Sequence, residues 1–401
     1  MNTPVPDPVR RTVILGLRRA APNGEVARVL LAFLASAGLF YVNIMPALVD
    51  GLIQGAGYTN RQAGLVGSSN VYGAALGALV AVFFVKRIAW RPTACVLLVG
   101  LIAMDVASMV VTTFEWLAAT RFAHGFVGGM LVGVGFSIIA RTREADRTFG
   151  YLLLVQFGLG GLGLMLLPPL VPHFGTPVLF WALVVFSGAT LAMVPFLEDY
   201  PPGVTPKRVL TASGAVRIGP LALGLLGTFL FQAGNMAVFA YVIGLGEHAG
   251  LPMSFISPAL AAASWVGIAG AGVVIVLSTR YGRTLPLAVA VFLTAACTWA
   301  LHFSSVPAVY LVANCVVGAT WSIGIPYLLG LCAAFDASGQ MAAIGGFASK
   351  MGLATGPMVA ALVVGRDDYG LVVNLGTAII LATLVAAWYP ARLLDGEAGP
   401  S

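Results

Sequence analysis

Long apolar segments constrain this chain more than any other feature of its sequence. A helix that crosses a bilayer needs about 20 largely apolar residues. Of the 401 residues, 59% are hydrophobic and 9% are charged, whereas soluble domains carry about 25% charged residues. We predict an all-α integral membrane protein with 12 transmembrane helices, at approximately 26–48, 62–85, 93–112, 116–140, 149–171, 177–197, 218–244, 254–278, 285–303, 306–333, 340–364 and 370–390.

The basic residues predict the orientation of these spans. With the N-terminus in the cytoplasm, only Arg61 and Arg366 fall in outer connections, and only Arg121 and Lys350 fall inside spans. Such a bias toward one side is the positive-inside pattern of membrane proteins. It also accounts for the net charge of +6 without a nucleic-acid partner. The other basic residues are Arg10, Arg11, Arg18, Arg19, Arg28, Lys86, Arg87, Arg91, Arg141, Arg143, Arg147, Lys207, Arg208, Arg217, Arg280, Arg283 and Arg392.

A polar connection divides the chain into two similar parts. The segment 198–217 contains "EDYPPGVTPKR", and its prolines and charges are typical of a linker. We predict a cytoplasmic tail at 1–25 rather than a signal peptide, six-helix bundles at 26–197 and 218–390, and a cytoplasmic tail at 391–401. Both termini are then cytoplasmic, and we expect a multi-pass protein of the inner (plasma) membrane.

The two predicted bundles repeat at a constant offset. A shift of 193 residues places "GALVAVFFVKR" over "GAGVVIVLSTR", Gly125 over Gly318 and Gly163 over Gly356. These matches fall in three different pairs of spans. They indicate a parallel internal repeat, which is common in secondary transporters.

This layout resembles the major facilitator superfamily, over nearly the whole chain. That family carries a G-x-x-x-D-R-x-G-R-R signature after its second helix and again after its eighth. In "VKRIAWR" we match Arg87 and Arg91, and in "STRYGR" we match Arg280, Gly282 and Arg283. The expected aspartate is Lys86 in the first copy and Thr279 in the second. The fourth span, "ATRFAHGFVGGMLVG", is similar to the family's R-F-x-x-G-x-x-x-G pattern.

The resemblance implies two bundles that rock about a central cavity, with the arginine motifs forming a cytoplasmic gate. It also implies that the first, fourth, seventh and tenth helices line the cavity. The polar residues of those helices are the candidates for substrate binding, or they bond between helices. They are Tyr41, Asn43, Arg121, Gln232, Asn235, Tyr241, Asn314, Trp321 and Tyr327.

Three charges lie inside predicted spans, where a charged group is expensive and by default marks function. Asp105 and Arg121 lie at similar depth on consecutive helices, and we predict that they pair. The pair either fastens two helices or acts as a proton-linked switch. His124 shares a helix face with Arg121, and is either a second proton carrier or a hydrogen-bonded core residue.

Lys350 is the third embedded charge, near the middle of the eleventh span in "GGFASKMGLATGP". No acidic residue at a matching depth of the second half offers it a partner. Lys350 either faces a wet cavity and holds an anion, or packs between helices with its amine bonded to backbone carbonyls.

These residues favour a secondary transporter of a small organic anion, possessing a carboxylate and in some cases an aromatic ring, driven by proton symport. Proton-coupled efflux of a hydrophobic compound is the alternative, and a non-transporting sensor or scaffold is the alternative class. We find no metal-ligand spacing among the cysteines and histidines and no catalytic motif. We therefore expect no enzyme activity, metal or cofactor, and a monomer whose partners are its solute, protons and the lipid bilayer.

Overall fold

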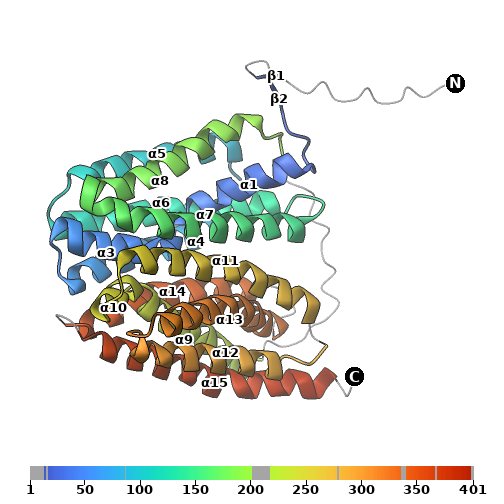
Figure 1. Ribbon diagram of the computed structural model, residues 1–401. Coiled ribbons are helices and arrows are strands. Elements are labelled where there is room, and N and C mark those ends of the chain that lie inside the picture. The colour runs from blue at the N-terminus through green and yellow to red at the C-terminus, as the bar shows by residue number, and fades with distance from the viewer. Residues whose placement is uncertain are drawn as a thin grey trace.

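The computed structural model is a bundle of helices in two halves (Figure 1). It describes residues 13–14, 17–85, 87–200, 217–277, 280–335, 340–365 and 368–398. The only strands in these ranges are β1 (Val13–Ile14) and β2 (Leu17–Arg18), which form a short antiparallel pair. Most of the predicted N-terminal tail and residues 201–216 of the predicted central loop lie outside the described ranges.

The first half holds eight α-helices and one 3-10 turn within its described residues. These are α1 (Glu25–Ala37), α2 (Phe40–Asn43), α3 (Met45–Ala56), α4 (Asn60–Phe84), α5 (Trp90–Val110), α6 (Phe114–Ile139), α7 (Ala145–Phe174), α8 (Pro177–Met193) and η1 (Val194–Phe196). The second half, as far as the structure describes it, holds α9 (Ile218–Phe239), α10 (Val242–His248), α11 (Met253–Leu277), α12 (Thr284–Ala300), η2 (Leu301–Phe303), α13 (Pro307–Ala334), α14 (Gln340–Val363) and α15 (Tyr369–Ala398).

The helix boundaries confirm the internal repeat. α1 and α9 begin at Glu25 and Ile218, and α4 and α11 begin at Asn60 and Met253, each pair 193 residues apart. The later helices keep nearly the same offset. Eleven helices of the described chain are long and apolar enough to cross a membrane. The predicted span that is missing from these eleven is the first, 26–48, which the structure divides among α1, α2 and α3.

The prediction of one continuous helix over 26–48 is therefore wrong. The chain breaks between α1 and α2 and again at Ile44, and α3 continues to Ala56. Pro46 favours the second break, because proline lacks an N–H and its ring clashes with the carbonyl four residues earlier. The predicted span 218–244 breaks as well, because α9 ends at Phe239 and α10 begins at Val242. The first helix of each half is thus interrupted toward its far end.

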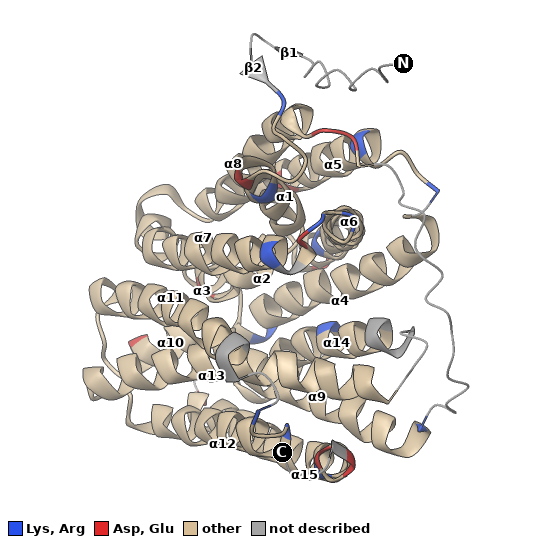
Figure 2. Cartoon of the chain, turned by 90° about the vertical axis from the view of Figure 1, so that its right-hand side faces the viewer, with Lys and Arg blue, Asp and Glu red and all other residues tan. Residues whose placement is uncertain are grey.

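Charged residues mark one end of the bundle, which we call the basic end. It is the end at which α1 and α9 begin, and Figure 2 views the molecule from it. There Arg28 pairs with Glu144 at 2.7 Å and Arg147 pairs with Glu25 at 2.8 Å. A hydrogen bond from Tyr151, together with Arg147 and Arg28, holds the pKa of Glu25 below its usual value. These contacts join α1 to α7 within the first half.

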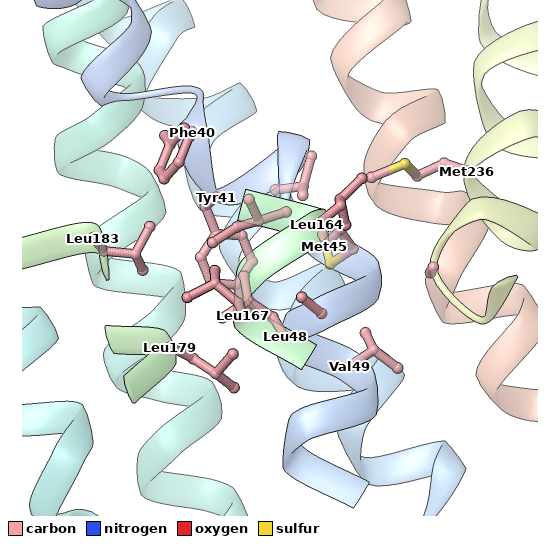
Figure 3. Packing of buried hydrophobic residues seen from close by; sticks show 14 of the residues in the cluster. Phe40, Tyr41, Met45, Leu48, Val49, Leu164, Leu167, Leu179, Leu183 and Met236 are labelled. Carbon is pink, nitrogen blue, oxygen red and sulfur yellow. The ribbon is translucent and has the colours of Figure 1, made fainter. Parts of the chain in front are cut away.

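The two halves share a core away from the basic end. The largest buried apolar cluster combines residues of the first half with residues of α9, α10, α11, α13, α14 and α15. Figure 3 shows part of it around α2 and α3, with Met236 of α9 reaching toward them. A second cluster, around Phe231 and Leu331, contains only residues of the second half. Apolar packing between the halves is therefore concentrated away from the basic end.

Glycines let helices of the first half pack backbone against backbone. A Cβ added to Gly125 of α6 would lie 1.8 Å from the carbonyl oxygen of Asn70 on α4. A Cβ on Gly73 or Gly77 of α4 would lie 2.0 or 1.9 Å from a carbonyl oxygen of α6. Glycines that permit such close approach are typical of membrane helix pairs. The α4–α6 contact therefore requires glycine.

We expect Gly125→Ala to destabilise the protein by about 1–3 kcal/mol, the usual cost of overpacking a tight core. Gly188→Ala is the matched control, because a Cβ at Gly188 on α8 meets no heavy atom within 4 Å. That control should be neutral or slightly stabilising, since alanine favours helices more than glycine does. The thermal unfolding midpoint of the purified protein measures both, and equal midpoints for the two variants would contradict the proposed contact.

Candidate functional site

A cavity of about 190 Å³ lies between the two halves. In the first half its walls come from the α1–α2 junction, α2, α4 and α7, and in the second half from α9, α11, α13 and α14. Most of the lining is apolar. The polar side chains on the wall are Asn43, Gln156, Asn235, Ser264, Asn314, Trp321 and Lys350.

Among the described residues of this lining, Lys350 carries the only charged side chain. Its position follows from the packing of α14. A Cβ on Gly352 or Gly356 would lie 2.3 or 2.4 Å from a carbonyl oxygen of α9, so that glycine face lies directly on α9. Lys350 is two residues from Gly352, on a different face of α14, and there it lines the cavity. Among the described residues, no acidic side chain forms an ion pair with Lys350.

An aromatic pair forms another part of the wall. The rings of Phe157 and Trp321 pack edge to face, with centroids 5.9 Å apart, and join α7 to α13 across the halves. The Trp321 indole nitrogen donates to the Gln232 side-chain oxygen at 2.8 Å. The Gln232 amide nitrogen donates to the Ser349 hydroxyl at 2.8 Å. Gln232 thus orients Trp321 and itself lies outside the cavity lining.

Two asparagines line the cavity, Asn235 on α9 and Asn314 on α13. The Asn235 amide nitrogen donates to the Phe231 carbonyl at 2.7 Å, and the Asn314 amide nitrogen donates to the Tyr310 carbonyl at 2.8 Å. The Asn235 side-chain oxygen has no hydrogen-bond partner within the described chain. A buried acceptor without a partner favours a ligand that donates to it. The described part of the wall therefore combines one cation, polar amide groups and the aromatic side chains of Phe157, Phe239 and Trp321.

The structure brings half of the predicted substrate-binding residues to this cavity. Lys350, Asn43, Asn235, Asn314 and Trp321 line it. The others lie elsewhere, and α6, the fourth span, contributes no residue to the lining because its glycine face is packed on α4. The predicted residues outside the lining are Arg121, Tyr41, Gln232, Tyr241 and Tyr327.

Each of the outlying tyrosines has a different environment. Tyr41 packs beside His124, with ring centroids 6.1 Å apart, inside the first half. Tyr241 lies in the break after α9 and its hydroxyl donates to the Asn60 carbonyl at 2.9 Å. Tyr327 is buried in the core of the second half. Gln156 and Ser264 line the cavity and were missed, because they lie on the fifth and eighth spans, which the resemblance assigns to other positions.

The predicted pairing of Asp105 with Arg121 is confirmed. Arg121 Nη1 lies 2.7 Å from Asp105 Oδ1, and both side chains are fully buried. Arg121 Nη2 also donates to the Met104 carbonyl at 2.9 Å. The guanidinium carbon lies 5.1 Å from the centre of the Phe180 ring, close enough for a cation–π contact. The charge of Arg121 is thus neutralised inside the first half and does not reach the cavity.

His124 completes this buried cluster. Its Nε2 lies 3.2 Å from Asp105 Oδ1, and its Nδ1 lies 2.8 Å from the Asn70 amide nitrogen. An amide nitrogen only donates, so Nδ1 accepts and the ring proton sits on Nε2, directed at Asp105. This arrangement fits a neutral imidazole. Protonation of Asp105 or His124 would change the hydrogen bonds of Arg121 as well.

The arginine motifs lie at the basic end, on the connections predicted from sequence. Arg91 pairs with Asp199 at 3.1 Å and donates to the Leu197 carbonyl at 2.7 Å. Gly282 adopts φ of +69°, a left-handed conformation that glycine favours. The backbone nitrogen of Arg283 donates to Asp395 Oδ1 at 2.7 Å.

Sequence reasoning missed the partners of these motifs. Asp395 of α15 accepts from two successive backbone nitrogens at the start of α12, and a Cβ on Gly282 would lie 2.7 Å from its carboxylate. Asp199 follows η1 and lies at the start of the predicted linker. Arg87 and Arg280 are exposed, whereas Lys86 and Thr279 lie outside the described residues. The described contacts of the motifs each stay within one half.

We expect Asp105→Ala to destabilise the protein by about 3–5 kcal/mol, because it leaves Arg121 as an uncompensated buried charge. Replacing both partners by apolar residues, as in Asp105→Leu with Arg121→Met, should recover most of that loss. Asp199→Ala is the control, since it removes a partly exposed ion pair worth about 0–1 kcal/mol. Denaturant or thermal unfolding measures all three, and an Asp105→Ala cost no larger than that of the control would contradict this role.

Comparisons with known proteins agree with the fold. A sequence model of the Major Facilitator Superfamily matches residues 29–361. Solved structures of the nucleoside transporter NupG superpose with TM-scores of 0.74 for a variant and 0.72, both at 12% sequence identity. The first alignment covers 91% of this chain and 99% of that structure, and the second covers 92% and 98%.

A third solved structure has a lower score. It is a bacterial homologue of the human lysosomal transporter Spinster, in an inward-facing and unoccupied conformation. It superposes with a TM-score of 0.63 at 13% identity, covering 93% of this chain and 96% of that one. A comparison with curated proteins finds no significant match. Likeness at this identity concerns the fold alone, so the solute has to be inferred from the cavity.

Proposed function

We propose, because this chain belongs to the major facilitator superfamily of transporters, that it moves a small organic anion across the membrane by proton-coupled symport. The observation that carries this proposal is the Lys350 side chain, which lines the cavity between the halves without an acidic partner among the described residues. A charge removed from water is expensive unless an opposite charge or hydrogen bonds compensate it. A bound carboxylate supplies both.

The rest of the wall supports a small solute with a ring and a donor group. The cavity volume of about 190 Å³ is below the range of about 300–1,000 Å³ typical of sites for drug-sized ligands. Phe157 and Trp321 suit an aromatic ring, and the Asn235 oxygen suits a hydroxyl or amine donor. This favours an aromatic or short aliphatic carboxylate over a large hydrophobic compound.

The charge distribution supports an orientation for the transporter. Basic residues gather at the end where α1 and α9 begin, and the positive-inside pattern assigns that end to the cytoplasm. Described polar contacts across the halves lie in the middle of the bundle or toward the opposite end. Examples are Tyr241 to Asn60 at 2.9 Å and Tyr72 to Thr355 at 2.9 Å. We infer a cytoplasm-facing state, closed on the other side.

We assign proton coupling to the contact between Asp105 and His124. Both are buried in the first half, where Asp105 holds Arg121 on α6. Adding a proton to Asp105 weakens its attraction for Arg121, which then needs other acceptors. A shift of α6 against α4 and α5 is the expected response. Because the cluster lies outside the cavity wall, its effect on the solute acts through helix movement.

We expect Lys350→Gln to weaken binding of a transported carboxylate by about 10- to 150-fold, the equivalent of about 1.5–3 kcal/mol for a hydrogen bond to a charged group. Lys350→Ala should lose at least as much. Binding to purified protein is measured over a panel of aromatic and aliphatic carboxylates. The same acids as neutral amides are the control, because their affinity should not depend on Lys350.

Two results would overturn the assignment of Lys350. One is unchanged affinity of Lys350→Ala for every anion that the wild-type protein binds. The other is tight binding of a neutral nucleoside with no binding of any acid, since a nucleoside would use the aromatic and amide groups of the wall without the lysine. A wild-type thermal midpoint for both variants shows that the fold is intact.

We expect wild-type protein in liposomes to accumulate the anion when the lumen is more alkaline than the medium. Asp105→Asn should still exchange the anion but no longer accumulate it with the pH gradient, because the amide cannot take up a proton. His124→Gln tests the same contact with the Asp105–Arg121 pair left in place. Unchanged gradient-driven uptake in both variants would contradict the assignment of proton coupling to Asp105 and His124. Accumulation of the anion only under the opposite gradient would indicate efflux.

A further inference from the structure

Two carboxyl groups from opposite halves of the transporter meet at the end away from the basic end. Asp50 lies on α3 of the first half and Glu247 on α10 of the second. Their carboxyl groups lie within hydrogen-bonding reach of each other. Asp50 is 6% exposed. The neighbouring Gln54, one turn along α3, donates to Glu247 Oε2 at 3.2 Å.

The helix that carries each carboxyl group is held by packing within its own half. On α3, a Cβ on Gly51 would lie 2.5 Å from Leu179 of α8, and one on Gly55 would lie 2.9 Å from Thr176. That glycine face fixes α3 against the first half and leaves Asp50 and Gln54 directed at α10. On the other side, the Tyr310 hydroxyl of α13 donates to the Val242 carbonyl at 2.9 Å and holds α10.

No base neutralises the two acids within the described chain. Neither carboxyl forms an ion pair with lysine, arginine or histidine there. Helices α8 and α11, which pack against α3 and α10, carry no ionisable residue. On α4 and α7 the ionisable groups nearest this end are Arg61 and His173, and both are exposed.

Among the described residues, the other ionisable groups near this site are tyrosines and one histidine. The hydroxyls of Tyr310 and Tyr241 donate to backbone carbonyls, so neither donates a hydrogen bond to Asp50 or Glu247. His248 of α10 is exposed and stacks near Tyr369, with ring centroids 5.5 Å apart. Two carboxyl groups in contact without a cation do not both stay ionised, and such a pair holds a shared proton.

We propose that Asp50 and Glu247 form a proton-binding latch, in which one shared proton holds the two halves together at the end opposite the basic end. When the halves separate there, each carboxyl gains water and ionises, and the proton leaves to the solution on that side. The latch therefore closes in acid and weakens as the pH rises. It returns its proton to the side from which it came, so it senses pH and adds nothing to the transport stoichiometry.

This inference requires only that the halves separate at this end, whichever solute is carried. Its experiment therefore uses no solute. The full chain, with Cys95, Cys297, Cys315 and Cys332 replaced by alanine, receives spin labels at Trp116→Cys of the first half and Val306→Cys of the second. Both positions are exposed, at 71% and 50%. Label distances are measured in lipid nanodiscs between about pH 5 and about pH 9.

In the parent protein we expect the long-distance population to grow as the pH rises. The ratio of closed to open molecules should fall about tenfold per pH unit while the closed pair holds one proton more than the open state. Asp50→Asn should stay closed at every pH, because its amide donates permanently to Glu247. Glu247→Gln should also stay closed at every pH. Asp50→Ala should favour the open state over the whole pH range, because alanine forms no hydrogen bond with Glu247.

Asp368→Asn is the matched control. Asp368 is exposed at the same end and accepts from the Leu371 backbone nitrogen at 2.9 Å, a bond that asparagine keeps. This variant should retain the parent response. A parent distance that does not depend on pH overturns the latch, and so does an unchanged pH response in Asp50→Asn and Glu247→Gln. Failure of anion binding at Lys350 leaves this measurement unaffected, so the two proposals stand or fall separately.

Discussion

The need to satisfy every backbone hydrogen bond inside the chain governs this molecule. A bilayer offers no water to unpaired N–H and C=O groups, so helices are the natural solution for spans in a single chain of this kind. The breaks in the first helix of each half are therefore informative. The Leu39 nitrogen donates to the Ser36 carbonyl at 2.8 Å, and the Tyr241 nitrogen donates to the Val238 carbonyl at 3.1 Å. At each break a local bond to the carbonyl three residues earlier thus replaces a helical one.

The breaks in the first helix of each half place polar side chains at the cavity and at the contact between the halves, positions that a straight helix would not give them. Asn43 ends α2 and reaches the cavity, while Asp50 on α3 and Glu247 on α10 meet beyond the breaks. The helix segments on either side of each break pack within their own half, and α3 and α10 also contact each other across the halves. A transporter that rocks its halves needs contacts that form and part at one end, and short helices on rigid bundles supply them.

Much of the architecture could be predicted from sequence because it follows from composition and periodicity. The spans, the 193-residue repeat and the pairing of Asp105 with Arg121 depend on apolar length, glycine positions and helix depth. The breaks could not be predicted with the same rules. Proline marks one of them at Pro46, but no glycine or proline lies between Phe239 and Val242. Tyr241 was therefore expected on the cavity wall, although it lies past the end of α9.

The cavity wall was only half predictable, for a related reason. Hydropathy identifies polar residues in spans but not which face of a helix they occupy once glycines set the packing. Arg121 and Asn314 are equivalent in the repeat, yet Arg121 is sealed against Asp105 while Asn314 lines the cavity. The position equivalent to Asp105 is Thr298, so the second half has no acid to neutralise a base there.

The repeat also explains why the charge of Lys350 stands alone. Its equivalent in the first half is Phe157, which lies on the opposite wall of the same cavity and packs against Trp321. The duplicated fold thus places a cation and an aromatic ring at matching positions on two sides of one space. A symmetric pair of lysines would repel each other in a medium of low dielectric constant, and a symmetric pair of phenylalanines would hold no charge. Loss of symmetry at this one pair of positions gives two equivalent helices different parts of the cavity wall, a cation on α14 and an aromatic ring on α7.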